Sequence, residues 1–225
     1  GASPATDRFG FGKAAYSFDA AASNGITAAN SAHLNSEHTT ISFWVNPSSF
    51  PGAGEGYILS LGGWQERWKI SLPNHGKPVF TTHSGGACCS DMDSGTPLEL
   101  NTWTHVVMTH DGSKDIIYLN GVQANEKAVS GGLDPTTHPL GIGYDPIDKA
   151  NYFDGAIDDV AIYNIALSAV EVADLYAAQN AFPGEEGNLV AHYGLNGAAS
   201  DASIFANDAD FNASPTTDRH GWANN

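Results

Sequence analysis

Asp154, Asp158 and Asp159 are crowded at the start of one strand-like segment, in a chain that carries 25 Asp and Glu residues. Ca²⁺ is bound by oxygen atoms of carboxylates, carbonyls and water, so this crowding makes calcium the best-supported cofactor. Successive residues of a strand point to opposite faces, and Asp158 and Asp159 are therefore not expected to serve one ion equally. The alternative interpretation is that these are turn and solvent-facing carboxylates, and their spacing matches no EF-hand pattern.

Three expected loops, 62–68, 82–95 and 143–152, combine aromatic rings with polar and charged side chains. Proteins bind sugars by placing an aromatic face against C–H groups and fixed polar groups against hydroxyls. Trp64 follows two glycines and is a better candidate than Trp68, which alternates with apolar residues and is expected in the core. The candidate ligand-binding residues are Trp64, Arg67, His83, Asp91, Tyr144 and Asp145.

The only two cysteines, Cys88 and Cys89, are adjacent and cannot connect distant loops. Adjacent Cα atoms lie ~3.8 Å apart, below the usual ~4.4–6.8 Å of a disulfide, so a bond between them would close a strained ring. Three interpretations are open: a vicinal disulfide, which an oxidising compartment would favour, two free thiols, or a metal or intermolecular link. His83 could join the pair in binding zinc, but two adjacent cysteines are a poor tetrahedral donor set.

The charge of the chain is strongly one-sided: 9 Lys and Arg residues face 25 Asp and Glu residues, for a formal net charge of −16. Nucleic acid and anionic membranes are disfavoured partners, because binding to phosphates needs lysine and arginine. Divalent cations are favoured, and solubility in salty surroundings is the alternative explanation. No segment reaches the ~18 consecutive apolar residues of a membrane span, and no signal peptide is visible.

Short strands separated by turns are the elements that would position these residues. Segments rich in β-branched and aromatic residues end at turn signals such as Asn46-Pro47 and Asn120-Gly121. The predicted strands are 40–45, 57–61, 67–72, 78–82, 103–110, 115–119 and 156–163. With 225 residues, this spacing predicts one all-β, two-sheet antiparallel sandwich (a jelly roll). One short helix is predicted near 168–179, where Ser168 and Glu171 form a capping box.

The segment 153–171 resembles the closing strand and helix of laminin G-like jelly-roll domains, which belong to the concanavalin A-like lectin/glucanase superfamily. Segment 41–47 resembles an inner strand of that family, and segments 101–107 and 118–121 resemble its central hairpin. The resemblance implies the same sandwich. It also implies a structural Ca²⁺ held by a closing-strand aspartate and by residues of an early strand. Carried over to this chain, the implied metal ligands are Asp19 together with Asp158 or Asp159.

The two ends of the sequence bear on the domain boundaries. Members of the family usually begin with a strand that resembles 189–197, which here lies near the C-terminal end. We expect residues 188–212 to fold back and complete one sandwich over 1–225 as a permuted segment; the alternative is that they belong to a following repeat. Residues 2–8 and 213–219 agree at six of seven positions, which predicts one unit of a tandem array with neighbouring repeats as partners.

The function predicted from these features is a non-catalytic, calcium-assisted carbohydrate-binding or adhesion module of a larger secreted or cell-surface protein. One alternative is a structural spacer repeat that binds only calcium. Another is a glycoside hydrolase or polysaccharide lyase on the same fold. The Glu-x-Asp-x-x-Glu strand of glucanases that resemble this fold is absent, as are the Gly-x-Ser-x-Gly and His-Glu-x-x-His motifs. We therefore expect no enzymatic activity.

Overall fold

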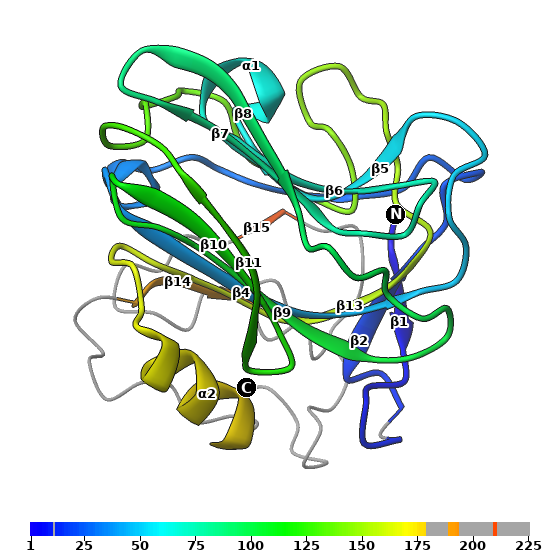
Figure 1. Cartoon of the computed structure of the whole chain (residues 1–225). Coiled ribbons are helices and arrows are strands. Elements are labelled where there is room, and N and C mark those ends of the chain that lie inside the picture. Colours follow the sequence, from blue (N-terminus) through cyan, green and yellow to red (C-terminus); the bar gives the residue numbers. More distant parts are fainter. Residues whose placement is uncertain (11, 179–188, 194–208, 211–225) are drawn as a thin grey trace, which may run out of the picture.

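Strands dominate the computed structural model and form two antiparallel sheets that pack against each other (Figure 1). The structure describes residues 1–10, 12–178, 189–193 and 209–210. The predicted two-sheet antiparallel sandwich is confirmed, and each predicted strand falls within an observed one, to within a residue or two at its ends.

The first sheet contains residues 155–163, the segment that resembles the closing strand of the family, as an inner strand. Its strands are, in spatial order, β1 (Ser3–Ala5), β2 (Ala15–Phe18), β13 (Gly155–Tyr163), β4 (Thr39–Pro47), β9 (Thr104–His110), β10 (Lys114–Leu119) and β11 (Val122–Ala128). One edge of β13 is shared, because β2 pairs with its residues 155–157 and β14 (Leu189–Tyr193) pairs with its residues 160–163.

The second sheet carries the polar face on which the candidate site lies. Its strands are, in spatial order, β15 (Ala209–Asp210), β3 (Ile26–Ala28), β12 (Leu140–Ile142), β5 (Glu55–Leu61), β6 (Trp68–Pro73), β7 (Val79–Ser84) and β8 (Ala87–Asp93). Consecutive strands β5 to β8 pair in order, so residues of neighbouring strands lie side by side across the sheet.

The expected fold-back of residues 188–212 falls only partly on the described chain. Within this segment, β14 pairs with β13 of the first sheet and β15 pairs with β3 of the second. The remainder of the segment lies outside the described residues, as does the repeated sequence 213–219. Completion of one domain by this segment and the tandem array both stay predictions.

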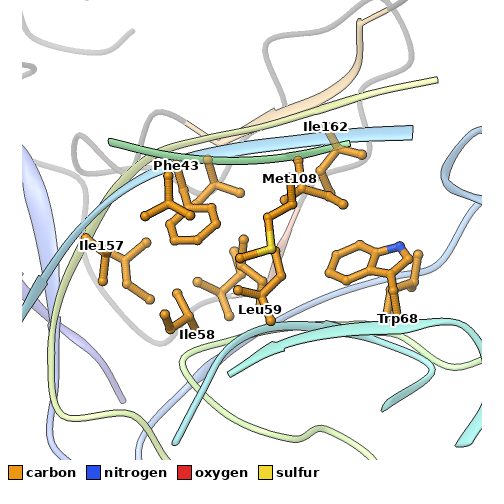
Figure 2. Packing of buried hydrophobic residues seen from close by; sticks show 14 of the residues in the cluster. Phe43, Ile58, Leu59, Trp68, Met108, Ile157 and Ile162 are labelled. Carbon is orange, nitrogen blue, oxygen red and sulfur yellow. The ribbon is translucent and has the colours of Figure 1, made fainter. Parts of the chain in front are cut away.

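The core lies between the two sheets. Figure 2 shows side chains of the first sheet, including Phe43, Met108 and Ile157, packed against Leu59 and Trp68 of the second sheet. All five side chains are buried, and burial of apolar surface stabilises a fold by roughly 25 cal/mol per Å². The alternation that predicts Trp68 in the core also sends the next residue of β6 to the outer face of the sheet.

Three helical elements lie between the strands in the part of the chain that the structure describes. The predicted helix is present as α2 (Ala169–Ala178), and its capping box forms: the Ser168 N–H donates to Glu171 Oε2 at 2.7 Å. The helix covers the outer face of the first sheet with Val172 and Leu175. The 3₁₀ helix η1 (Ala32–Asn35) and the short helix α1 (Gly63–Glu66) were not predicted. No helix in the described part of the chain is long and apolar enough to cross a membrane.

Candidate functional site

A groove of about 510 Å³ crosses the outer face of the second sheet, over strands β5 to β8. Most of its lining side chains are polar or charged, with aromatic and small apolar groups among them. The lining residues are Glu55, Tyr57, Trp64, Lys69, Pro73, Val79, Thr81, Cys89, Asp91, Asp93 and Asn151.

Strand alternation places polar side chains on the floor of the groove. Lys69 of β6 lies beside Thr81 of β7, which lies beside Asp91 of β8. In the next row Val79 lies beside Asp93. The intervening residues of β6 to β8 point into the core, so every second residue of these strands lies on the outer side of the sheet, where Lys69 and Thr81 are largely buried by their neighbours.

A charged network fixes the β5 side of the floor. Lys69 Nζ contacts both carboxylate oxygens of Glu55 at 2.5 Å and Ser71 Oγ at 3.1 Å, and it lies 4.9 Å from the centre of the Tyr57 ring. Burial raises the pKa of Tyr57, and the negative charge of Glu55 raises it further. The positive charge of Lys69 is therefore already balanced by protein groups, and hydrogen bonds connect the polar side chains of the groove floor.

Trp64 of α1 and Cys89 of β8 line the groove together. Trp64 belongs to α1, which begins after Gly62 at a left-handed φ of 79°. A Cβ on Gly62 would meet Thr136 at 3.0 Å, so only glycine fits that position. The Trp64 side chain keeps 43% of its surface exposed, which leaves an aromatic face for a ligand. Cys89 is joined to Cys88 by a vicinal disulfide, and its Sγ lies 3.6 Å from the Trp64 carbonyl.

Two of the six predicted ligand-binding residues, Trp64 and Asp91, line this groove. His83 lies behind it, with Nε2 3.9 Å from Cys89 Sγ. Asp145 is buried, and it lines a small neighbouring cavity together with Trp64. The pKa of Asp145 is raised, chiefly by burial.

Arg67 and Tyr144, the other two predicted ligand-binding residues, hold parts of the fold together. The guanidinium of Arg67 is fully buried and donates to the carbonyls of Ser36 at 2.6 Å and Asp134 at 2.7 Å. Burial lowers the pKa of Arg67 to about 10. The Tyr144 hydroxyl hydrogen-bonds to Thr27 at 2.5 Å. Arg67 and Tyr144 therefore lie outside the lining of the groove, and their role in ligand binding stays a prediction.

The three predicted calcium ligands fall at two separate places. Because Phe18 pairs with Gly155 and Tyr16 with Ile157, Asp19 continues β2 away from Asp158. Asp19 is exposed and accepts the N–H of Ala21 at 2.8 Å, which makes it a turn residue. The carboxylates of Asp158 and Asp159 lie instead on the outer face of the first sheet, where they bind an arginine.

A shared calcium ion does not fit this arrangement. Arg8 contacts Asp158 Oδ2 at 3.2 Å and Asp159 Oδ2 at 2.8 Å, and Asp158 is buried. Burial and the charge of Asp159 raise the pKa of Asp158. Calcium binding elsewhere in the chain stays a prediction. The single group of metal-type donors found among the described residues is His83, Cys88 and Cys89, and its two sulfur atoms are bonded to each other.

The sequence interpretation missed most of the groove floor, including Glu55, Tyr57, Lys69, Thr81 and Asp93. A signal for these residues was present. They alternate with core residues along β5 to β8, as residues on the outer face of a half-buried strand do. The prediction placed the candidate residues in loops, where binding residues are often found, and not on the strands.

Comparison with known proteins places the fold. The family model described as the concanavalin A-like lectin/glucanases superfamily matches residues 20–173. No curated protein sequence matches the chain. Among solved structures, a putative carbohydrate binding protein from Bacteroides ovatus aligns with a TM-score of 0.67 at 18% identity. The alignment covers 88% of this chain and 58% of that one.

Two further solved structures share the fold of this chain. Domain 4 of AbnA, a GH43 extracellular arabinanase from Geobacillus stearothermophilus solved in complex with arabinotriose, aligns with a TM-score of 0.61 at 21% identity, covering 78% of this chain and 81% of that one. The binding domain of Paraclostridial Mosquitocidal Protein 1 aligns at 0.59 and 23% identity, covering 70% and 42%. This chain thus spans about half the length of the Bacteroides and Paraclostridial chains.

Proposed function

This chain belongs to the concanavalin A-like lectin/glucanase superfamily, and on that premise we propose that its β5–β8 groove binds carbohydrate without turnover. The observation that carries the proposal is the combination of an exposed Trp64 with a polar, hydrogen-bonded strand floor in one groove. An aromatic face packs against sugar C–H groups, while fixed polar groups orient the hydroxyls. Similar structures that include a carbohydrate binding protein and an arabinanase domain support this assignment.

The charges of the groove favour a neutral glycan over an acidic one. Its charged lining residues are three acids, Glu55, Asp91 and Asp93, and one cation, Lys69, which Glu55 already holds. A uronate or sialate carboxylate entering this groove would face three like charges. The lysines beside these acids already contact protein oxygens: Lys69 contacts Glu55, Lys77 contacts Asp93, and Lys127 contacts the Asp91 carbonyl. Neutral hexose or pentose chains carry no such penalty.

The absence of turnover is part of the proposal. Glu55 accepts contacts from Lys69 and Ser71, and Asp91 accepts a hydrogen bond from the Thr81 hydroxyl at 2.6 Å. These carboxylates are therefore built into the sheet surface rather than held ready for proton transfer to a sugar. We further propose that the chain works as a binding or adhesion module of a secreted or cell-surface protein.

Binding of the full chain to immobilised neutral and acidic polysaccharides, at low and moderate salt, tests the proposal. We expect retention on at least one neutral glycan, weaker retention on polygalacturonate or hyaluronan, and no release of reducing sugar. Retention on acidic glycans as strong as on neutral ones would contradict the charge argument alone. No retention on any glycan would contradict the binding function and favour a structural spacer, and sugar release would favour an enzyme.

A further inference from the structure

We propose that Arg8 is the resident cation of the Asp158–Asp159 pair, so that this part of the fold needs no calcium ion. Both carboxylates bind one guanidinium, through Nη1 for Asp158 at 3.2 Å and Nη2 for Asp159 at 2.8 Å. A planar guanidinium presents several N–H donors in a fixed geometry that suits two acceptors at once. The inference is independent of the groove and of what the groove binds.

A β-bulge explains why both aspartates face the same side. Along β13, Asp158 lies opposite Trp44 and Ala161 lies opposite Ser42. Between these pairs β13 advances by three residues while β4 advances by two. Asp159 takes a left-handed φ of 48° within this bulge. Adjacent side chains of a regular strand point to opposite faces, and the extra residue removes that restriction.

The core residues on either side fix the bulge in place. Ile157 and Val160 are both buried in the main core, and the two aspartates between them must face outward together. The Asp159 N–H also donates to Asp158 Oδ1 at 2.8 Å, which ties the two residues to each other. Two carboxylates in such close contact repel, so the local fold requires a positive charge beside them.

Arg8 is positioned to supply that charge permanently. Its guanidinium lies 4.4 Å from the centre of the Trp44 ring and 4.5 Å from that of Phe9, and only 5% of its side chain is exposed. The Trp44 ring continues into a stack with His105 and Tyr176 of α2. Arginine keeps its charge when buried, so this cation is present without any metal.

Removal of Arg8 should convert the pair into a site that responds to calcium. We would compare the melting temperatures of the wild-type full chain and Arg8→Ala in chelator and in excess CaCl₂, with Lys114→Ala as the control. Lys114 forms an exposed ion pair with Glu126, and its loss is expected to cost little. We expect calcium to raise the melting temperature of Arg8→Ala more than that of the wild type, because an ion bound elsewhere in the chain would stabilise both. We expect Arg8→Ala to melt roughly 6–20 °C lower in chelator and to recover partly in calcium.

Several outcomes would overturn the inference. One is a calcium response of Arg8→Ala no larger than that of the wild type, and another is an Arg8→Ala chain as stable as the wild type. A variant that ignores calcium would contradict the view that the guanidinium occupies a cation position. If Arg8→Ala fails to fold, calorimetric titrations of chelator-treated wild type and Asp158→Asn with CaCl₂ decide: binding heat that the wild type gives and Asp158→Asn lacks contradicts the inference, and equal heats support it.

Discussion

Replacing Trp64 by alanine is expected to weaken binding of a neutral oligosaccharide by roughly 10- to 100-fold, or about 1.4–2.7 kcal/mol. The side chain is 43% exposed at the groove and is the largest exposed aromatic surface of its lining, so it offers the stacking face for a sugar ring. Because the side chain contributes little to the core, the free energy of unfolding should change by less than about 1 kcal/mol. Titration calorimetry with the glycan retained most strongly measures the loss directly.

The matched control for this variant is Val170→Ala. Val170 is 70% exposed on α2, which covers the first sheet, on the side of the molecule away from the groove. Its removal should leave both affinity and stability unchanged. Equal affinities of Trp64→Ala and wild type would show that the sugar binds elsewhere or without stacking on this ring.

Replacing Asp115 by alanine is expected to destabilise the fold by about 3–5 kcal/mol. Asp115 Oδ1 lies 2.7 Å from His110 Nδ1, and both side chains are fully buried. The Thr82 hydroxyl donates to Asp115 Oδ2 at 2.7 Å, and His110 Nε2 lies 3.0 Å from the Gly131 carbonyl. Without the carboxylate, an imidazole nitrogen and a buried hydroxyl lose their acceptor.

Urea unfolding of Asp115→Ala and of Glu126→Gln compares the loss of a carboxylate from a buried pair with the loss of charge from an exposed pair. Glu126 pairs with Lys114 on the same hairpin, but both side chains are about half exposed, so its neutralisation should cost less than about 1 kcal/mol. A cost near 1 kcal/mol for Asp115→Ala would mean that the buried pair contributes no more than a surface ion pair.

The strands and the closing helix could be predicted because their signals are local. Asn120-Gly121 ends a strand by turn chemistry, and the Ser168–Glu171 capping box forms as the spacing predicts. Each pattern depends on residues within a few positions of each other. The helix α1 has no such signal, since a four-residue helix that begins at the second glycine of a pair shows no helical periodicity.

The role of Arg67 could not be read from its neighbours in the sequence. Its guanidinium binds the carbonyls of Ser36 and Asp134, which are 31 and 67 residues away. A charged residue between two tryptophans is typical of a ligand-binding loop, and only the packed fold shows that this one is buried.

The metal prediction depended on a register that the sequence does not reveal. Regular alternation would separate Asp158 from Asp159, and the bulge that brings them to one face arises from pairing with β4. Arg8 lies 150 residues from Asp158 in the sequence, so no local sequence pattern indicates their contact. On β6, in contrast, the residue of the groove floor alternates with the core residues Ile70 and Leu72, and this alternation is visible in the sequence.

An NMR titration of the labelled full chain with arabinotriose and with other neutral oligosaccharides tests the central claim most directly. We expect the largest shift changes at the Trp64 indole N–H and at backbone amides of β6, β7 and β8, with those of α2 unchanged. Shift changes confined to the first sheet, or no changes with any glycan, would contradict the assignment of this groove as a carbohydrate-binding site.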